Sequence, residues 1–361
     1  MSGPLSPAAL PPGFLINSRY EVISTLGRGS NGVVYEVLDH HQGEVSALKI
    51  ILAPVHMVGW NEAQTLTGLR GEFILPVRNA ELASGLPFIV TAVAPRTVAK
   101  VMQRGPIDVD QAVHWIRQAS RGIARIHDVG LLHNDIKPDN LFLNEHYNVL
   151  VGDLGVACIR DTHTGKGHFA GTAETMAPEV AAIGATLPQA AWQGQRPTSL
   201  GSDVYSLGAT LYWLLAGTPP FTVPGNGIAT MQAVAAGPPP RTRDVAPHVP
   251  QALADRVERA MARNPADRYP SAAALDAALG NMPTVIRHWN RVVTHAGHTA
   301  CFLGTGHGSD LNVCAVPTGT RTQHRIEIRH VASGRRVSPW PLVATQRELP
   351  RALRSVFRDN A

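Results

Sequence analysis

The sequence predicts an α+β fold made of a β-rich first lobe, a helical second lobe and a small α+β extension at the C-terminus. Strand-like alternation of apolar and polar residues fills residues 20–51. Helical periodicity replaces this alternation after Ala92. From Val285 onward short strand-like pieces return, and a basic helix follows them. The length of 361 residues fits two or three such units.

The first lobe is expected to be built on an antiparallel meander. Its three strands read YEVISTL, GVVYEVLDH and VSALKIIL, and the turns between them fall at GRGSNG and HHQGE. A short helix is expected over residues 60–69 and a further strand over residues 88–90. The Pro-rich residues 1–13 are expected to be disordered.

The second lobe is expected to be mainly helical. A mostly apolar stripe recurs at helical spacing and consists of Val113, Ile116, Ser120, Ile123 and His127. A helix over residues 203–216 should end at Gly217, because glycine followed by prolines is a typical stop signal. Two more helices are expected near 251–262 and 271–279, and the basic helix of the extension near 346–357. The expected domains are residues 14–280, with lobes over about 14–92 and 93–280, and a basic domain over 281–361.

Composition excludes several classes of protein. No run approaches the roughly 20 apolar residues that cross a bilayer, so no membrane partner is expected. The N-terminus carries neither the positive charge nor the apolar core of a secretory signal. Three cysteines, Cys158, Cys301 and Cys314, are too few for a disulfide framework. A reducing, cytoplasmic location is therefore expected.

The positive charge is concentrated at the C-terminus. Residues 281–361 hold 11 Arg and 4 acidic residues, a net charge of +7, whereas the whole chain carries +5. Such a region suggests an acidic partner or nucleic acid, with Arg321, Arg325, Arg329, Arg335 and Arg336 as candidate contacts. An Arg-biased composition is the simpler alternative, since the chain has 28 Arg and only 4 Lys.

Residues 26–34 contain a glycine pattern suited to phosphate. Gly27, Gly29 and Gly32 would let backbone amides approach a polyphosphate without interference from a Cβ atom. The pattern lies between two predicted strands, which argues against a dinucleotide-binding βαβ unit. Lys49 follows 17 residues after Gly32 on an apolar strand, where a lysine is costly unless paired. Glu62 is a candidate partner for it.

A second group of polar residues supplies the parts that phosphoryl transfer needs. Asp135, Lys137 and Asn140 occur within one short segment, and Asp153 follows Asn140 by 13 residues. One carboxylate can orient a hydroxyl and accept its proton, and a cation can neutralise phosphoryl charge. A carboxylate and an amide oxygen suit Mg²⁺, which prefers oxygen ligands.

Taken in order, these motifs resemble those of the eukaryotic-type (Hanks-type) serine/threonine protein kinases. The matching segments are the glycine loop at 26–34, Ala47-Leu48-Lys49, His133-Asn134-Asp135 through Asn140, Asp153-Leu154-Gly155, Ala177-Pro178-Glu179 and Arg268. The resemblance implies a two-lobed protein-kinase-like fold that uses ATP and Mg²⁺ to phosphorylate serine and threonine in proteins.

The resemblance also implies roles for single residues. Asp135 would be the catalytic base and Lys137 would contact the γ-phosphate, while Asn140 and Asp153 would hold Mg²⁺. Lys49 would bind the α- and β-phosphates and pair with Glu62. The other nucleotide contacts would be Leu26, Gly27, Gly29, Ser30, Gly32, Val34, Ala47, the hinge residues Ala92 and Ala94, and Phe142. Thr172 would lie near Asp135 and Lys137, and Glu179 would pair with Arg268.

The sequence departs from the family pattern in three places. Asn134 replaces the arginine that would meet an activation-loop phosphate, so activity is expected not to depend on phosphorylation of Thr162 or Thr164. Leu154 replaces a phenylalanine, which is a mild change. Residues 189–196 are extra, near where protein substrates dock. A nucleotide-binding pseudokinase or scaffold and a small-molecule kinase are the alternatives to a protein kinase.

A further group of residues in the extension could chelate zinc. His295, His298, Cys301, His307 and Cys314 lie close together in the sequence. Their spacing is not that of a standard zinc finger, and Cys and His also pack in ordinary strands. The sequence leaves both interpretations open.

Overall fold

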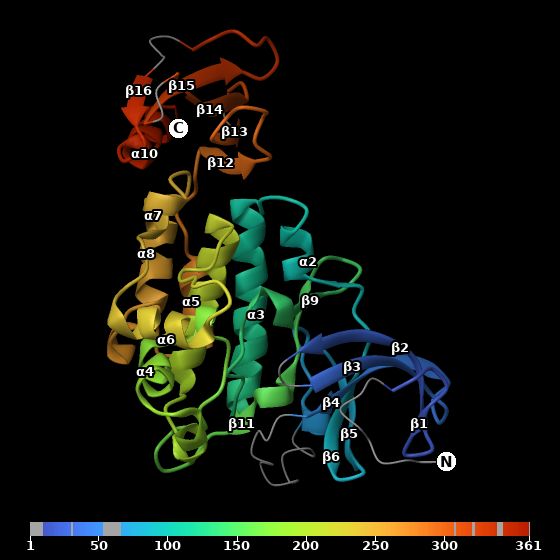
Figure 1. The fold of residues 1–361 in the computed structure, drawn as a ribbon. Coiled ribbons are helices and arrows are strands. Elements are labelled where there is room, and N and C mark those ends of the chain that lie inside the picture. The colour runs from blue at the N-terminus through green and yellow to red at the C-terminus, as the bar shows by residue number, and fades with distance from the viewer. Residues whose placement is uncertain are drawn as a thin grey trace.

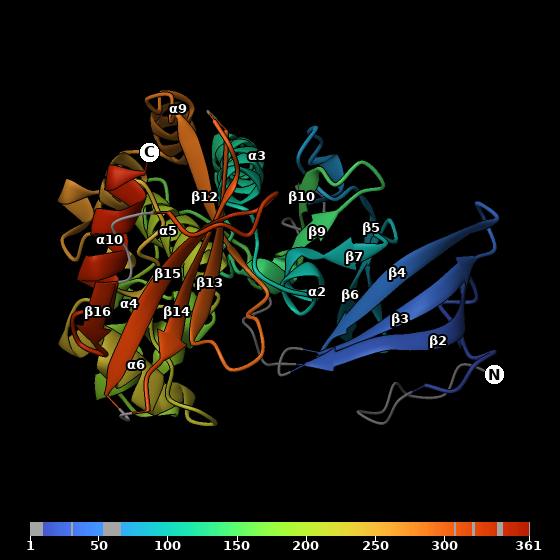
Figure 2. The ribbon, with the colours of Figure 1, turned by 90° about the horizontal axis from the view of Figure 1, so that it is seen from above.

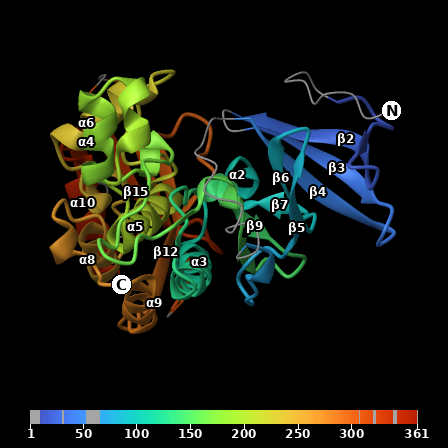
Figure 3. The same ribbon diagram turned by 90° about the horizontal axis from the view of Figure 1, so that it is seen from below.

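The computed structural model of the protein describes residues 10–29, 32–52, 66–306, 308–319, 322–337 and 342–360. A sheet lobe and a helical lobe lie side by side (Figures 1 and 3), and a second sheet lies beyond the helical lobe (Figure 1). The predicted α+β class with a β-rich first lobe and a helical second lobe is confirmed.

The first lobe is a six-stranded antiparallel sheet in the order β1-β2-β3-β4-β6-β5. Its strands are β1 (Leu15–Ile16), β2 (Tyr20–Gly29), β3 (Gly32–Asp39), β4 (Glu44–Ile51), β5 (Val77–Ala83) and β6 (Leu86–Thr91). The predicted meander is confirmed as β2, β3 and β4. Side chains alternate along β3, so Val33, Tyr35 and Val37 are buried while Val34 faces the other way and is half-buried.

Two predictions for this lobe concern segments that the structure describes only in part. Leu10 is buried and its amide donates to the Tyr35 hydroxyl at 3.1 Å, although residues 1–13 are predicted to be disordered. Residues 1–9 lie outside the described part. Of the helix predicted over 60–69, residues 66–68 are helical and residues 60–65 lie outside the described part.

The second lobe is built around two long helices, α3 (Val109–Asp128) and α5 (Leu200–Ala216). The Asp108 side chain caps α3 by accepting from the amides of Asp110 and Gln111. Helix α5 is buried almost throughout and ends, as predicted, at Gly217 in the left-handed conformation. The remaining helices are α2 (Val98–Met102), α4 (Pro178–Thr186), α6 (Gly227–Ala236), α7 (Thr242–Val245), α8 (Gln251–Ala260) and α9 (Ala272–Gly280).

The candidate site lies on two segments that connect short strands of this lobe. β7 (Arg96–Thr97), β9 (Leu141–Leu143) and β10 (Val149–Val151) form one small sheet, and β8 (Leu131–Leu132) pairs with β11 (Cys158–Ile159). Residues 133–140 connect β8 to β9, and residues 152–157 connect β10 to β11. Both connections therefore begin and end on hydrogen-bonded strands.

The C-terminal extension is a five-stranded antiparallel sheet with one helix. Its elements are β12 (Arg287–Val292), β13 (Ala300–Gly306), β14 (Leu311–Pro317), β15 (Gln323–His330), β16 (Leu342–Thr345) and α10 (Leu349–Asp359). Trp289 and Phe302 pack on Phe357 of α10 with ring centroids 4.9 and 5.0 Å apart. The sheet has its own hydrophobic core.

The extension lies against the end of the helical lobe where α3 begins, away from the first sheet (Figures 1 and 2). Asn290 on β12 accepts from the Val109 amide at 2.9 Å and donates to Asp108. Arg354 on α10 pairs with Asp244 at 3.0 Å. Polar contacts from the first strand and the last helix therefore join the extension to the helical lobe.

Candidate active site

Asp135 lies at the centre of a hydrogen-bonded group on the segment between β8 and β9. Its Oδ1 accepts from the Thr172 hydroxyl at 2.5 Å, and its Oδ2 accepts from Lys137 Nζ and Asn140 Nδ2, both at 2.9 Å. Lys137 Nζ also donates to Thr172 at 2.6 Å. The predicted position of Thr172, beside Asp135 and Lys137, is confirmed.

Electrostatics keep the Asp135 carboxyl ionised. Burial alone would raise its pKa, but the charge of Lys137 and the hydrogen bonds from Thr172 and Lys137 outweigh burial and hold the pKa below its usual range. Asp135 is thus a buried carboxylate with fixed orientation, suited to aligning a hydroxyl group.

The segment that carries Asp135 is anchored by a fully buried carboxylate on α5. Asp203 accepts from the backbone amides of His133 and Asn134, each at 2.9 Å, and its Oδ2 lies 2.8 Å from His127 Nε2. Burial would raise the Asp203 pKa, but the contact with His127 and the hydrogen bond from the His133 amide lower it overall. Asp203 begins the helix predicted over residues 203–216 and His127 belongs to the predicted apolar stripe, but neither pattern indicates their contact.

His133 connects Asp135 to the neighbouring segment. Its Nδ1 accepts from the Asp135 amide at 3.2 Å, and its Nε2 lies 3.0 Å from the Gly152 carbonyl. An amide can only donate and a carbonyl can only accept, so these contacts assign a neutral ring with the proton on Nε2. The Gly152 amide in turn donates to the Asn140 carbonyl at 3.0 Å, which ties the segment before Asp153 to the one that carries Asp135.

Asp153 meets Lys49 from the first lobe. The Lys49 Nζ on β4 lies 2.5 Å from Asp153 Oδ1, so this ion pair links the sheet lobe to the helical lobe. Asp153 adopts a left-handed backbone conformation, with φ of 58°, which turns its side chain toward the lysine. Glu62, the predicted partner of Lys49, lies outside the described residues.

Asn140 and Asp153 have the donor chemistry that a magnesium ion needs. Asn140 donates through Nδ2 to the carbonyl and carboxylate of Asp135, which points its amide oxygen the other way. The Asp153 side chain accepts from Lys49 Nζ and from the Gly155 amide, and both contacts fall on Oδ1. An amide oxygen and a carboxylate are hard oxygen ligands, so this pair fits Mg²⁺.

The glycine loop occupies the end of the β2–β3 hairpin. Gly29 is paired with Gly32, and Ser30 lies outside the described residues. A Cβ atom on Gly27 or Gly29 would meet nothing within 4 Å, whereas one on Gly32 would lie 2.0 Å from the Ile50 carbonyl oxygen. Gly32 is therefore required by the sheet itself, while the space beside Gly27 and Gly29 is open.

Apolar residues surround Lys49 on one face of the first sheet. Val34 is paired with Lys49 across β3 and β4, and Ala47 lies two residues before Lys49, so all three share a face. Across the lobes, a Cβ at Gly152 would lie 2.7 Å from the Phe142 ring, so Phe142 packs directly over the residue before Asp153. Leu26 is exposed, and Ala92 and Ala94 are half-buried at the connection between lobes.

Asn134 connects the segment of Asp135 to the beginning of the activation segment. It is buried in a left-handed conformation, with φ of 67°, and its Nδ2 donates to the Val156 carbonyl at 3.1 Å and to Cys158 Sγ at 3.3 Å. Further along, Asp161 Oδ1 accepts from the amide and hydroxyl of Thr164 at 2.7 and 2.9 Å. Neutral contacts and a local turn thus order this segment.

Glu179 and Arg268 form the predicted ion pair. The two contacts are 2.8 and 2.7 Å, and the remaining guanidinium donors bind the carbonyls of Ala262, Gly201 and Arg263. Arg268 is fully buried, but the Glu179 side chain keeps 23% of its surface exposed. The predicted pair is confirmed, and it is buried on the arginine side only.

The part of the chain that carries these residues is similar to known proteins. A family profile described as "Protein kinase domain" matches residues 20–278. The chain belongs to the protein kinase family. The chain is 30% identical over 277 residues to serine/threonine-protein kinase PknL of Mycobacterium bovis, across 73% of this chain and 66% of PknL.

Two further relatives come from Mycobacterium tuberculosis. Serine/threonine-protein kinase PknK is 30% identical over 273 residues, across 73% of this chain and 23% of PknK. Serine/threonine-protein kinase PknD is 29% identical over 301 residues, across 79% of this chain and 43% of PknD. The chain thus matches 66% or less of the length of these curated relatives.

The charged extension, residues 281–361, lies beyond the family match, which ends at residue 278. Arg325, Arg329 and Arg336 all lie within 4 Å of Glu327, at 2.7, 3.0 and 3.7 Å, so this acid offsets part of their charge. Arg321 lies outside the described residues. An acidic or nucleic-acid partner stays a prediction. None of the helices in the described ranges is both long and apolar enough to cross a lipid bilayer.

Proposed function

We propose that the protein transfers the γ-phosphoryl group of ATP to serine and threonine hydroxyls of other proteins. The observation that carries this proposal is the contact of Asp135 with Lys137, Thr172 and Asn140, linked through Gly152 to the pair of Lys49 and Asp153. Together these groups comprise a buried carboxylate, two cations and two oxygen ligands. Phosphoryl transfer requires these components.

In the proposed reaction the acceptor oxygen forms a bond to the γ-phosphorus while the bond from that phosphorus to the bridging oxygen of ADP breaks. Asp135 would orient the acceptor hydroxyl and receive its proton, since its carboxylate is ionised and held by three donors. Lys137 would neutralise charge on the transferred group. Asn140 and Asp153 would hold Mg²⁺, which when bound offsets the phosphate charge.

The nucleotide would lie between the first sheet and the small sheet of β9. Lys49 would contact its α- and β-phosphates, because the pair with Asp153 fixes the ammonium group near the proposed magnesium ligands. The backbone of Gly27 and Gly29 would approach the phosphates through the open space beside them. Val34 and Ala47 on one side and Phe142 on the other would contact the base, with Leu26, Ser30, Gly32 and the hinge residues Ala92 and Ala94 completing the predicted contacts.

Two alternatives differ in what is transferred and to what. A pseudokinase would bind ATP without transfer, but the four key polar groups, Lys49, Asp135, Asn140 and Asp153, are present and hydrogen-bonded. A small-molecule kinase would share the catalytic groups. The contact of Thr172 with Asp135 and the Glu179–Arg268 pair favour a protein substrate, since both belong to the protein kinase pattern.

The decisive experiment uses ATP labelled at the γ-phosphate, with Mg²⁺ and a set of general protein acceptors. We expect label on serine and threonine of protein with the wild type and a loss with Asp135→Asn. Transfer only to metabolites in a cell extract would favour the small-molecule kinase. ATP binding with no transfer to any acceptor would favour the pseudokinase and overturn the proposal.

We further propose that activity does not require phosphorylation of the activation segment. Asn134 occupies the position of a phosphate-binding arginine and makes neutral contacts to Val156 and Cys158, and the Asp161 turn orders the segment without a phosphate. Protein treated with a phosphatase, and then freed of that enzyme, should keep its initial rate. A Thr162→Ala and Thr164→Ala double variant that loses most activity, while a Thr186→Ala control does not, would contradict this proposal.

A further inference from the structure

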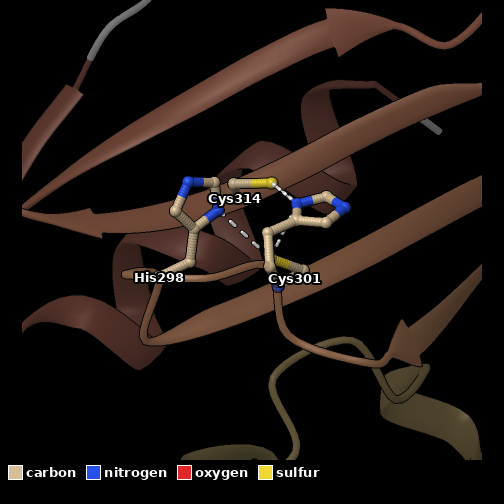
Figure 4. A group of neighbouring side chains, drawn as sticks. His298, Cys301 and Cys314 are labelled. Atoms are coloured by element: carbon tan, nitrogen blue, oxygen red, sulfur yellow. Dashed lines mark hydrogen bonds between the residues drawn. The ribbon is translucent and has the colours of Figure 1, made fainter.

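Two histidines and two cysteines of the extension converge on one point. His295 and His298 lie in the connection between β12 and β13, Cys301 lies on β13, and Cys314 lies opposite it on β14. One ligand atom from each residue can be chosen so that all four lie within 4.8 Å of one another. Figure 4 shows the His298 ring and the two cysteine side chains directed toward the same place. His307, the fifth residue of the predicted group, lies outside the described residues.

The distances match those of a tetrahedral zinc site. Cys301 Sγ lies 3.3 Å from both His295 Nδ1 and His298 Nδ1, and Cys314 Sγ lies 3.5 Å from His295 Nδ1. With Zn–S and Zn–N bonds of ordinary length, sulfur and nitrogen ligands of one tetrahedral zinc ion are separated by about 3.6 Å. A single ion can therefore reach all four side chains with small adjustments.

Ordinary packing does not account for this arrangement. His295 is exposed and His298 is half-buried, so burial of apolar surface gives little reason for both rings to turn inward. Two imidazole nitrogens and the His295 amide all contact Cys301 Sγ. A thiol has one proton, so it can donate to only one ring and must accept from the other ring and from the amide, whereas a cation placed among these atoms would bind the thiolate and both ring nitrogens directly.

We propose that His295, His298, Cys301 and Cys314 bind one zinc ion. On binding, the two thiols would lose their protons to solvent, and the two thiolates would balance the charge of Zn²⁺. All four positions are filled by protein, which is typical of a structural site and leaves no position open for a substrate. The proposal does not depend on the kinase activity.

The ion would fix the β12–β13 connection onto the sheet. That connection follows Arg291, whose Nη1 lies 3.4 Å from the Ala216 carbonyl at the end of α5. Val293 in the same connection lies beside Gly105 of the helical lobe, 3.7 Å from a Cβ placed there. Zinc would therefore stabilise the part of the extension that contacts the helical lobe.

The test is the metal content of the full chain, purified under reducing conditions without added metal and measured by elemental mass spectrometry. We expect about one zinc ion per chain. Replacing zinc with Co²⁺ should produce thiolate-to-cobalt absorption and the intense visible bands of a tetrahedral site. His298→Ala and Cys314→Ser should each lower zinc content. The matched controls Cys158→Ala and His330→Ala should retain it.

Wild-type measurements keep the proposal open to refutation even where a variant fails to fold. Absence of zinc together with absence of cobalt bands in folded wild-type protein would overturn it. An intact mass two hydrogens below the reduced value, from a Cys301–Cys314 disulfide in the protein as isolated, would also overturn it. Full zinc content in a folded Cys301→Ser and Cys314→Ser double variant would place the metal elsewhere and exclude this site.

Discussion

Replacing Thr172 with valine removes a hydroxyl group that contacts both Asp135 and Lys137 and changes little else. The hydroxyl donates to Asp135 at 2.5 Å and accepts from Lys137 at 2.6 Å, while the direct contact of Lys137 with Asp135 at 2.9 Å stays possible. Valine has nearly the shape of threonine. The perturbation therefore tests how closely Asp135 must be held for transfer.

The size of the effect follows from the charged partners. A hydrogen bond to a charged group contributes about 1.5–3 kcal/mol, which corresponds to about a 10- to 150-fold change in rate. We expect kcat to fall by that factor. The KM for ATP should change little, because the Thr172 hydroxyl contacts Asp135 and Lys137 rather than Lys49 or Asp153. Loss of one of the contacts that lower the Asp135 pKa should also shift the acidic limb of the kcat–pH profile to higher pH.

Initial-rate kinetics with labelled ATP across a range of pH would measure these quantities, with Thr172→Ser as the matched control because serine restores the hydroxyl. Wild-type kcat for the valine variant would refute the reasoning. A serine variant as slow as the valine variant would also refute it, since the methyl group rather than the hydroxyl would then matter.

Three further predictions concern stability. Arg268→Met leaves Glu179 and three carbonyls without their donor. It should lower the free energy of unfolding, measured by chemical denaturation, by about 3–5 kcal/mol. A decrease below about 1 kcal/mol would contradict the stabilising role of this pair. Gly32→Ala should destabilise the first lobe in thermal melts, because its Cβ would lie 2.0 Å from the Ile50 carbonyl, whereas Gly27→Ala should melt like the wild type. Burial, with a smaller effect of Arg291, lowers the His248 pKa from 6.5 to about 3, so below pH 6.5 the unfolded chain binds a proton that the folded chain does not. The free energy of unfolding should therefore fall with falling pH by up to about 1.4 kcal/mol per pH unit from this group. His248→Leu should remove that part of the pH dependence. An unchanged slope in the variant would show that His248 does not titrate on unfolding.

Sequence alone was sufficient to predict contacts that belong to an ordered set of motifs. The contact of Thr172 with Asp135 and the Glu179–Arg268 pair followed from the order of motifs, and both are present. The end of α5 was predictable from Gly217, because its left-handed backbone favours glycine. These are features that short segments or a family pattern determine.

Contacts that depend on three-dimensional packing could not be predicted in this way. Asp203 binds the segment of Asp135 across 69 residues or more, and no local pattern indicates that its carboxylate faces two amides. The pairing of Cys301 with Cys314 depends on the register of β13 and β14. The excess of arginine in the extension overstated its free positive charge, since three of these residues share Glu327.

The contacts of the extra segment predicted near residues 189–196 could not be predicted from the sequence either. In the structure residues Gln189–Gly194 of this segment form a 3-10 helix. The Trp192 ring lies 4.8 Å from the Phe169 ring of the activation segment, and its Nε1 donates to the Leu187 carbonyl at 3.0 Å. The resemblance to the family pattern indicated an insertion between Glu179 and Asp203, but only the folded chain shows what it packs against.

The central claim is that one site both holds ATP with magnesium and transfers phosphate, with the two tasks divided between Asp153 and Asp135. Magnesium-dependent ATP binding by calorimetry, measured beside transfer on the same preparations, tests it most directly. Asp135→Asn should bind ATP like the wild type and transfer about 10²- to 10⁴-fold more slowly, and Asp153→Asn should lose the magnesium-dependent part of binding. Transfer at the wild-type rate by Asp135→Asn, or unchanged magnesium-dependent binding by Asp153→Asn, would contradict the account.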